Sequence, residues 1–215
     1  MDPLQPGPLN GVTILDFTWV LAGPFATRTL SDMGAYIIKV EKYKEGTNER
    51  HLPLIQTNQG VTQSSYNINC NRGKKSICIN LKHPQGMELI HDLIRKSDVL
   101  IENFAPGVMD RLKLDYESVR KVREDIIYCS ISCFGHWGPY CHKPGYDMIA
   151  QGASGWTDQN MNPQSAPVSI GDMNASGHAA LAICGALFSR QKTGRGQNID
   201  ISMMDCLFSY HENTL

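Results

Sequence analysis

The chain has 215 residues, of which 41% are hydrophobic and 19% are charged, and its formal net charge is −1. This composition is typical of a globular protein with at most two domains, and it lacks the basic surplus of a nucleic-acid-binding protein. No apolar run approaches the roughly 20 residues that a membrane-spanning helix needs. The first residues carry no recognisable secretion or transit signal, so we expect a cytoplasmic protein.

The first predicted unit is strand–helix–strand. GVTILDF (11–17) and AYIIKVE (35–41) are short, apolar and rich in β-branched residues, as buried strands are. Between them, AGPFATRTLSDMG (22–34) predicts a helix with Pro24 in its first turn and Gly34 at its end. Two strands joined by a helix within about 30 residues are typical of a parallel sheet.

The same alternation continues after a polar, turn-rich excursion over residues 41–70. Further strands are predicted at residues 75–82, 98–104, 125–135 and the first part of 197–205. Further helices are predicted at residues 83–97, 115–123, 145–155 and 172–194. In the helix at 83–97, the residues expected mostly on one face are Met87, Leu89, Ile90, Leu93 and Ile94. The alternation predicts an α/β fold with a doubly wound, mostly parallel sheet.

The domain division follows from the two ends of the chain. Residues 1–8 form a Pro/Gly-rich leader, and residues 9–215 are expected to form one α/β domain. The last residues, CLFSYHENTL, are an apolar helical stretch without a capping glycine, so we expect this domain to be truncated at its C-terminus. The helix at 172–194 is almost continuously apolar between Ala179 and Phe188 and is expected to be covered on several sides.

The seven cysteines are odd in number and irregularly spaced, so they do not form a disulfide framework. Cys129, Cys133, Cys141 and His142 could be metal ligands, but YCSISCFG alternates like a strand and places the first two on one apolar face. We therefore expect no metal site, and buried thiols in a reducing compartment.

Ligands bind open parallel sheets at the carboxyl ends of the strands. Residues expected at that edge are Leu21, Ala22, Lys42, Asn103, Phe104 and Ala105. Cations that cluster nearby in the sequence, with Arg111 further on, are Arg72, Lys74, Lys75 and Lys82. These cations could hold a polyanion, and the alternative is a solvated charged face. Neither G-x-G-x-x-G after the first strand nor a phosphate-binding P-loop is present, which argues against a dinucleotide or P-loop site.

Asp172 is a single carboxylate between Gly171 and a long small-residue helix, and the next one downstream is Asp200. An Asp in this place can cap the helix, or it can be a carboxylate nucleophile. His178 could be a base, although a packing role is favoured. No G-x-S-x-G elbow supports a hydrolase triad.

Six segments in this order together resemble the class III CoA-transferase family, the group of formyl-CoA and carnitine CoA-transferases. They lie at residues 11–41, 71–86 (NRGKKSICINLKHPQG), 98–112 (DVLIENFAPGVMDRL), 145–155 (GYDMIAQGASG), 171–187 (GDMNASGHAALAICGAL) and 192–205 (KTGRGQNIDISMMD). The similarity extends from Leu9 to the last residue. The resemblance implies an interlocked homodimer and a second domain. This chain would not include that second domain.

The resemblance implies that Asp172 is the nucleophile and that CoA or acyl-CoA is bound as a substrate, with no prosthetic group. Positions that would contact CoA are Leu21, Ala22, Lys42, Ile79, Asn80, Leu81, Lys82, Asn103, Phe104, Ala105, Arg111, Lys143, Pro144, Gly145 and Tyr146. The CoA phosphates need cations, and Arg111 is expected to be the best fixed donor. The start of the helix at 172 is expected to lower the pKa of Asp172 and to offer N–H groups to oxyanions.

Two departures from the family bear on the substrate. Formyl-CoA transferases carry Gln where this chain has Leu21, which argues against oxalate or formyl groups. The α-methylacyl-CoA racemases carry His where this chain has Tyr146, and they use it with the Asp for proton transfer. We therefore expect an acyl-CoA:carboxylate CoA-transferase that works through an aspartyl mixed anhydride and an aspartyl-CoA thioester. The alternatives are a racemase-like enzyme and a non-catalytic CoA-binding fragment.

Overall fold

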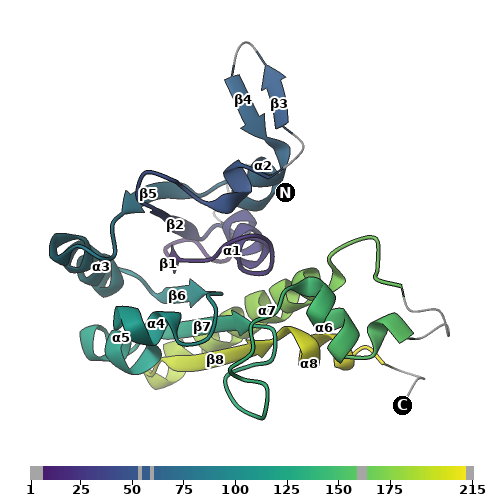
Figure 1. The fold of residues 1–215 in the computed structure, drawn as a ribbon. Coiled ribbons are helices and arrows are strands. Elements are labelled where there is room, and N and C mark those ends of the chain that lie inside the picture. The colour runs from purple at the N-terminus through teal and green to yellow at the C-terminus, as the bar shows by residue number, and fades with distance from the viewer. Residues whose placement is uncertain (1–6, 53–54, 59–60, 159–163, 212–215) are drawn as a thin grey trace.

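Six parallel strands form the central sheet of the computed structural model, which describes residues 7–52, 55–58, 61–158 and 164–211 (Figure 1). They are β1 (Thr13–Asp16), β2 (Tyr36–Lys42), β5 (Lys75–Ile79), β6 (Val99–Glu102), β7 (Ile127–Ser132) and β8 (Gln197–Ser202). Their order across the sheet is β5-β2-β1-β6-β7-β8. Counted within this sheet alone, that is the order 3-2-1-4-5-6 of a Rossmann fold. The predicted parallel α/β fold is confirmed, and most of the proposed leader at 1–8 lies outside the described residues.

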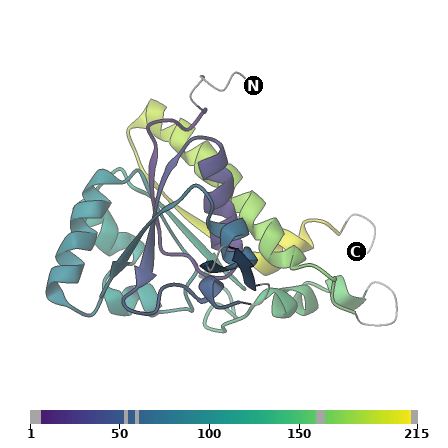
Figure 2. The same cartoon turned by 90° about the horizontal axis from the view of Figure 1, so that it is seen from above.

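Helices cover both faces of the sheet, as the view from above shows (Figure 2). The helices are α1 (Ala22–Asp32), α2 (Ser65–Asn71), α3 (Pro84–Lys96), α4 (Val108–Leu112), α5 (Tyr116–Val122), α6 (Asp147–Ala153), α7 (Ile170–Thr193) and α8 (Met203–Phe208). Helices α1 and α7 pack together on one face of the sheet, whereas α3 and α5 lie on the other face. Among the described residues, no helix has the length and apolar character needed to cross a membrane.

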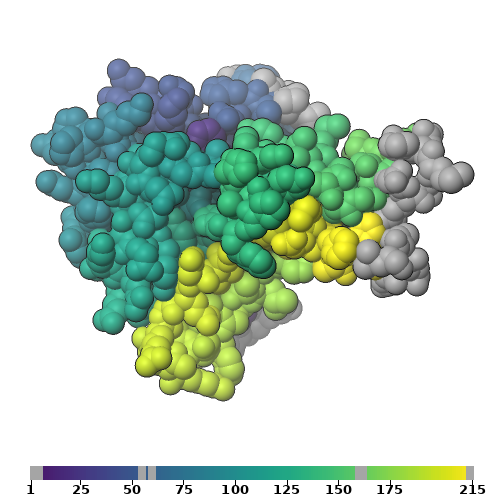
Figure 3. Space-filling model, turned by 60° about the horizontal axis from the view of Figure 1, so that its bottom comes forward, coloured from purple at the N-terminus to yellow at the C-terminus, as the bar shows by residue number. Residues whose placement is uncertain are grey.

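The central strands are buried on both faces, so alternate residues of one strand belong to two different cores. Ile14 and Ile37 belong to the core under α1 and α7, while Leu15 points to the opposite core under α3 and α5. Strand β1 lies inside the sheet, between β2 and β6, and is largely buried. The space-filling view shows only a small purple patch of the N-terminal region on this face (Figure 3). The central position of β1 places the segment that follows it at the middle of the carboxyl edge.

The stretch at 41–70 is more ordered than its polar composition suggests. It contains a short 3-10 helix (Asn48–Arg50), the antiparallel hairpin of β3 (Ile55–Asn58) and β4 (Val61–Ser64), and α2. The hairpin projects away from the body of the molecule (Figure 1), and its polar sequence lacks the apolar run that predicted the other strands. Helix α2 is capped by the Ser64 hydroxyl, which accepts from Asn67 N–H at 3.2 Å.

The expectations about burial hold for most of the residues that they named, with some exceptions. Leu89 in α3 is 53% exposed, so it does not share the buried face of Ile90 and Ile94. Helix α7 is covered on several sides, as expected, because Ala179, Ile183 and Leu187 are buried, while Leu181 and Phe188 are exposed. The thiols divide: Cys70, Cys129, Cys133 and Cys206 are buried, Cys141 and Cys184 are half-buried, and Cys78 is exposed. Apolar character alone does not tell which side of an element faces the core.

Candidate active site

A cavity of about 880 Å³ opens at the carboxyl edge of the sheet. Its walls come from the segments that follow β1, β2, β5, β6 and β7, and from the start of α7. After β1 the chain continues to one side of the sheet and after β6 to the other, so neighbouring connections diverge and leave a crevice between them. The strand order thus explains why the cavity is here.

Nearly all the residues predicted to contact CoA line this one cavity. They are Ala22, Lys42, Ile79, Asn80, Leu81, Lys82, Asn103, Phe104, Ala105, Arg111, Lys143, Pro144, Gly145 and Tyr146, together with Asp172. Leu21 is the exception. It is buried, and its backbone carbonyl accepts from Phe25 N–H at 2.8 Å inside the first turn of α1.

Some of the cations that cluster in the sequence line the cavity, and the others do not. Lys42, Lys82, Arg111 and Lys143 line the cavity and are exposed, whereas Arg72, Lys74 and Lys75 do not line it. The ammonium of Lys74 is buried 3.0 Å from an Asp16 carboxylate oxygen, and Arg72 forms a surface ion pair with Asp32. Neighbours in sequence point in different directions here, so the part of the prediction that grouped these cations is wrong.

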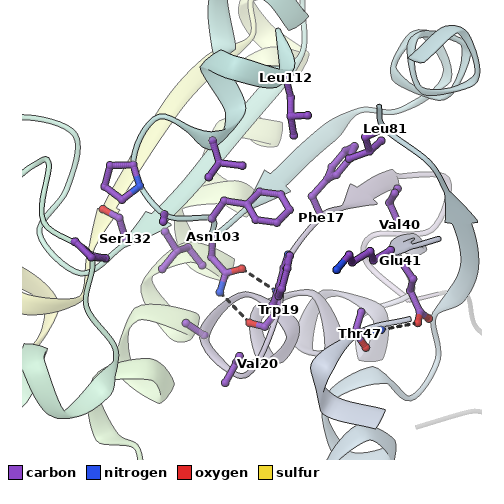
Figure 4. Close-up of a pocket in the computed structure, with 18 of the residues that line it drawn as sticks. Phe17, Trp19, Val20, Val40, Glu41, Thr47, Leu81, Asn103, Leu112 and Ser132 are labelled. Atoms are coloured by element: carbon purple, nitrogen blue, oxygen red, sulfur yellow. Dashed lines mark hydrogen bonds between the residues drawn. The ribbon is translucent and has the colours of Figure 1, made fainter. Parts of the chain in front are cut away.

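Aromatic and apolar residues that directly follow β1 form another wall, which the sequence prediction missed. Phe17, Trp19 and Val20 line the cavity (Figure 4). The Trp19 ring meets the Phe104 ring edge to face, with centroids 5.2 Å apart. The rule that ligands bind at strand ends was a usable signal for these three residues.

Asp172 lies in the first turn of α7 but does not cap it. The capping position belongs to Ser169, whose side chain makes no capping bond. The carboxylate of Asp147, at the start of α6, accepts from Gly171 N–H at 2.7 Å and from Asp172 N–H at 3.2 Å. Gln151 also donates to Asp147, at 2.6 Å. The capping alternative for Asp172 is therefore wrong, and its carboxyl group lines the cavity.

Two expectations about the electrostatics of Asp172 are also wrong. Burial, followed by the charge of Asp147, raises the pKa of Asp172 from 3.8 to about 7, and a hydrogen bond from Ala22 N–H opposes this only in part. Burial and the charge of Asp147 therefore outweigh the lowering of the pKa that was expected from the helix start. The N–H groups of Gly171 and Asp172 are bonded to Asp147, so these two groups are not free for an oxyanion.

The other candidate groups from the sequence were a set of possible metal ligands and His178. Within the described part of the chain, no three His, Cys, Asp or Glu side chains are arranged to hold a metal ion. A ring nitrogen of His178 lies 3.0 Å from the Asn174 carbonyl oxygen, and its ring meets the Tyr210 ring edge to face. These contacts match the packing role expected for His178.

The fold and the cavity together define an α/β protein with Rossmann strand order, a cationic cleft at its switch point and a half-buried carboxyl group in that cleft. A family model described as CoA-transferase family III matches residues 9–215. The chain belongs to this family.

Relatives of known name agree with this assignment. The chain is 40% identical to acetyl-CoA:oxalate CoA-transferase of Acetobacter aceti, in an alignment that covers 99% of this chain and 55% of the relative. It is 39% identical to succinyl-CoA:glutarate CoA-transferase of Homo sapiens, over 92% of this chain and 45% of the relative. A crystal structure of a CAIB/BAIF family protein from Brucella suis matches with a TM-score of 0.92 and 39% identity, over 97% of this chain and 56% of that one. The chain spans about half the length of these relatives.

Proposed function

We propose that this chain supplies the CoA-binding and acyl-accepting part of an enzyme that transfers CoA between carboxylic acids. The main observation behind the proposal is that one cavity is lined both by cations and by a carboxyl group. Exposed cations suited to phosphate groups line it, and so does the half-buried carboxyl group of Asp172. The relatives that match over most of this chain are named as CoA-transferases, which supports the same reaction class.

In the proposed reaction, an ionised Asp172 oxygen attacks the thioester carbonyl of acyl-CoA. The new C–O bond forms a mixed anhydride as the C–S bond breaks and CoA leaves as a thiolate. The thiolate then attacks the Asp172 carbonyl carbon, which gives an aspartyl-CoA thioester and releases the first carboxylate. The second carboxylate reacts through the same two steps in reverse order and leaves as its CoA thioester, and Asp172 returns to its starting form.

A pKa of about 7 fits a carboxylate that must both attack and leave. The raised pKa makes the ionised form a stronger nucleophile than an ordinary aspartate, while about half of the molecules are ionised at neutral pH. Acylation should therefore accelerate as the pH rises through about 7.

A single-turnover experiment tests this function. The chain is mixed with acetyl-CoA or succinyl-CoA, quenched with hydroxylamine, and analysed by peptide mass spectrometry. We expect release of CoA and a hydroxamate on Asp172, and neither in Asp172→Asn. The control is Asp92→Asn, which removes an exposed carboxylate paired with Arg95 and should react like the wild type. Absence of the Asp172 hydroxamate would contradict the covalent route, and α-proton exchange without it would favour the racemase-like alternative.

A further inference from the structure

The segment between β1 and α1 is clamped by Asn103, which directly follows the neighbouring strand β6. The Asn103 side chain accepts from Trp19 N–H at 2.7 Å and donates to the Trp19 carbonyl at 2.9 Å (Figure 4). One amide thus satisfies both backbone groups of one residue across the switch point of the sheet. This pairing engages both the oxygen and the nitrogen of the Asn103 amide with protein backbone.

Residues on either side of Trp19 are fixed as well. The Thr18 carbonyl accepts from the buried Lys39 ammonium at 2.7 Å. The Ala22 carbonyl lies 2.5 Å from the Ser176 hydroxyl of α7. The segment 18–22 is therefore held from β2, from the residue that follows β6 and from α7, three parts of the chain that are distant in sequence.

The clamped segment contains a strained residue. Val20 has a φ of 62°, in the left-handed region that β-branched residues rarely adopt. Such a conformation persists only when the surroundings impose it, and strained residues of this kind concentrate at functional sites. Val20 lines the cavity directly after the clamped Trp19.

The strained segment ends beside Asp172. Ala22 is the first residue of α1, and the Ser176 hydroxyl lies 2.5 Å from the Ala22 carbonyl oxygen and 2.7 Å from the Asp172 carbonyl oxygen, which holds the two residues next to each other. In this position the backbone N–H of Ala22 lowers the pKa of the Asp172 carboxyl group. The direction of this N–H depends on the backbone before it, because Leu21 and Val20 connect it to the clamp. Loss of the clamp would let Val20 relax and move the N–H away.

We propose that Asn103 is a positioning residue, whose amide holds the strained segment 18–22 so that Ala22 N–H stays on the Asp172 carboxyl group. This deepens the proposed function, on which it rests, and it assigns the Asn103 side chain to the protein backbone instead of to the bound thioester. The N–H orients the carboxyl group and favours its ionised, attacking form.

Other titratable groups also face Asp172. Asp147 approaches from α6 and raises its pKa. Cys133 follows β7 and Tyr66 lies in α2, and burial raises the pKa of both, so both are neutral near pH 7. None of these three groups contacts the Asn103 amide among the bonds described, so a change at Asn103 leaves their contributions in place.

The test follows the Asp172 carboxyl carbon by NMR during a pH titration of the ligand-free chain. In Asn103→Ala the pKa should rise by about 0.5 or more above that of the wild type, because the contribution of Ala22 N–H is lost. The matched control is Asn198→Ala, an exposed asparagine in β8, which should titrate like the wild type. Adding Val20→Gly to Asn103→Ala should restore the wild-type pKa, since glycine adopts a positive φ without strain.

Several outcomes would overturn the proposal. A folded Asn103→Ala variant with an unchanged Asp172 titration is one, and loss of CoA affinity in that variant without a change in titration is another. If Asn103→Ala does not fold, the double variant with Val20→Gly decides: wild-type titration supports the clamp, and an unfolded double variant overturns it. The titration needs no substrate, so its result is independent of whether acyl transfer to Asp172 is observed.

Discussion

The substitution Asp172→Asn should stabilise the folded chain at alkaline pH and leave it almost unchanged at acid pH. Asparagine has the shape of the protonated carboxyl group and carries no charge. In the folded state, burial and Asp147 raise the pKa of Asp172 from 3.8 to about 7. The folded chain therefore binds this proton more tightly than the unfolded chain does, and the wild type loses stability as the pH rises from about 4 to about 7.

The size of the effect follows from the pKa difference. An increase from 3.8 to about 7 corresponds to about 4 kcal/mol against the ionised carboxylate in the folded state. Because the side chain is half-buried and the chain can relax around it, we expect Asp172→Asn to raise the free energy of unfolding by about 2–4 kcal/mol at pH 8. Near pH 4 the difference should fall below about 1 kcal/mol.

Urea denaturation followed by tryptophan fluorescence at pH 4, 6 and 8 measures this difference. The control Asp92→Asn removes an exposed carboxylate and should change stability by less than about 1 kcal/mol at each pH. A constant difference between wild type and Asp172→Asn across this pH range would refute the reasoning, as would a less stable variant at pH 8. The stabilised variant should also be unable to form an acyl-enzyme, as expected where an active-site group is retained at a cost in stability.

Three other substitutions test the cavity and the core beneath it. Arg111→Ala should weaken CoA binding by about 1.5–3 kcal/mol in calorimetry, with a smaller difference for dephospho-CoA; equal affinity would remove Arg111 from the phosphate site. Asp16→Asn should lower the free energy of unfolding by about 3–5 kcal/mol, because the buried Lys74 loses its carboxylate partner, and a loss below about 1 kcal/mol would contradict this pairing. Gly86→Ala would place a Cβ 2.2 Å from the Asn80 carbonyl oxygen, so it should cost about 1–3 kcal/mol and weaken CoA binding. Its control is Gly152→Ala, where the space is open and stability should change by less than about 1 kcal/mol; equal effects of the two substitutions would be evidence against the close contact.

The sequence by itself determined the type and approximate position of most elements. Short apolar runs rich in β-branched residues identified the strands, and the Pro24 and Gly34 signals bounded α1, because these patterns depend on neighbours only a few residues apart. The collinear motifs also predicted the family, and the family model that matches residues 9–215 confirms this prediction. The hairpin of β3 and β4 was missed, since its sequence is polar and has no apolar run.

Only the tertiary structure decided which side chains contact one another at the site. Arg111 and Lys74 look alike in the sequence, but one lines the cavity and the other is buried against Asp16, because strand order sets which face and which edge each side chain meets. Asp147 and Asp172 are 25 residues apart, and only the packing of α6 on α7 makes the first cap the helix of the second and raise its pKa. Capping, desolvation and the Asn103 clamp are contacts between distant segments, and no local pattern encodes which segments will meet.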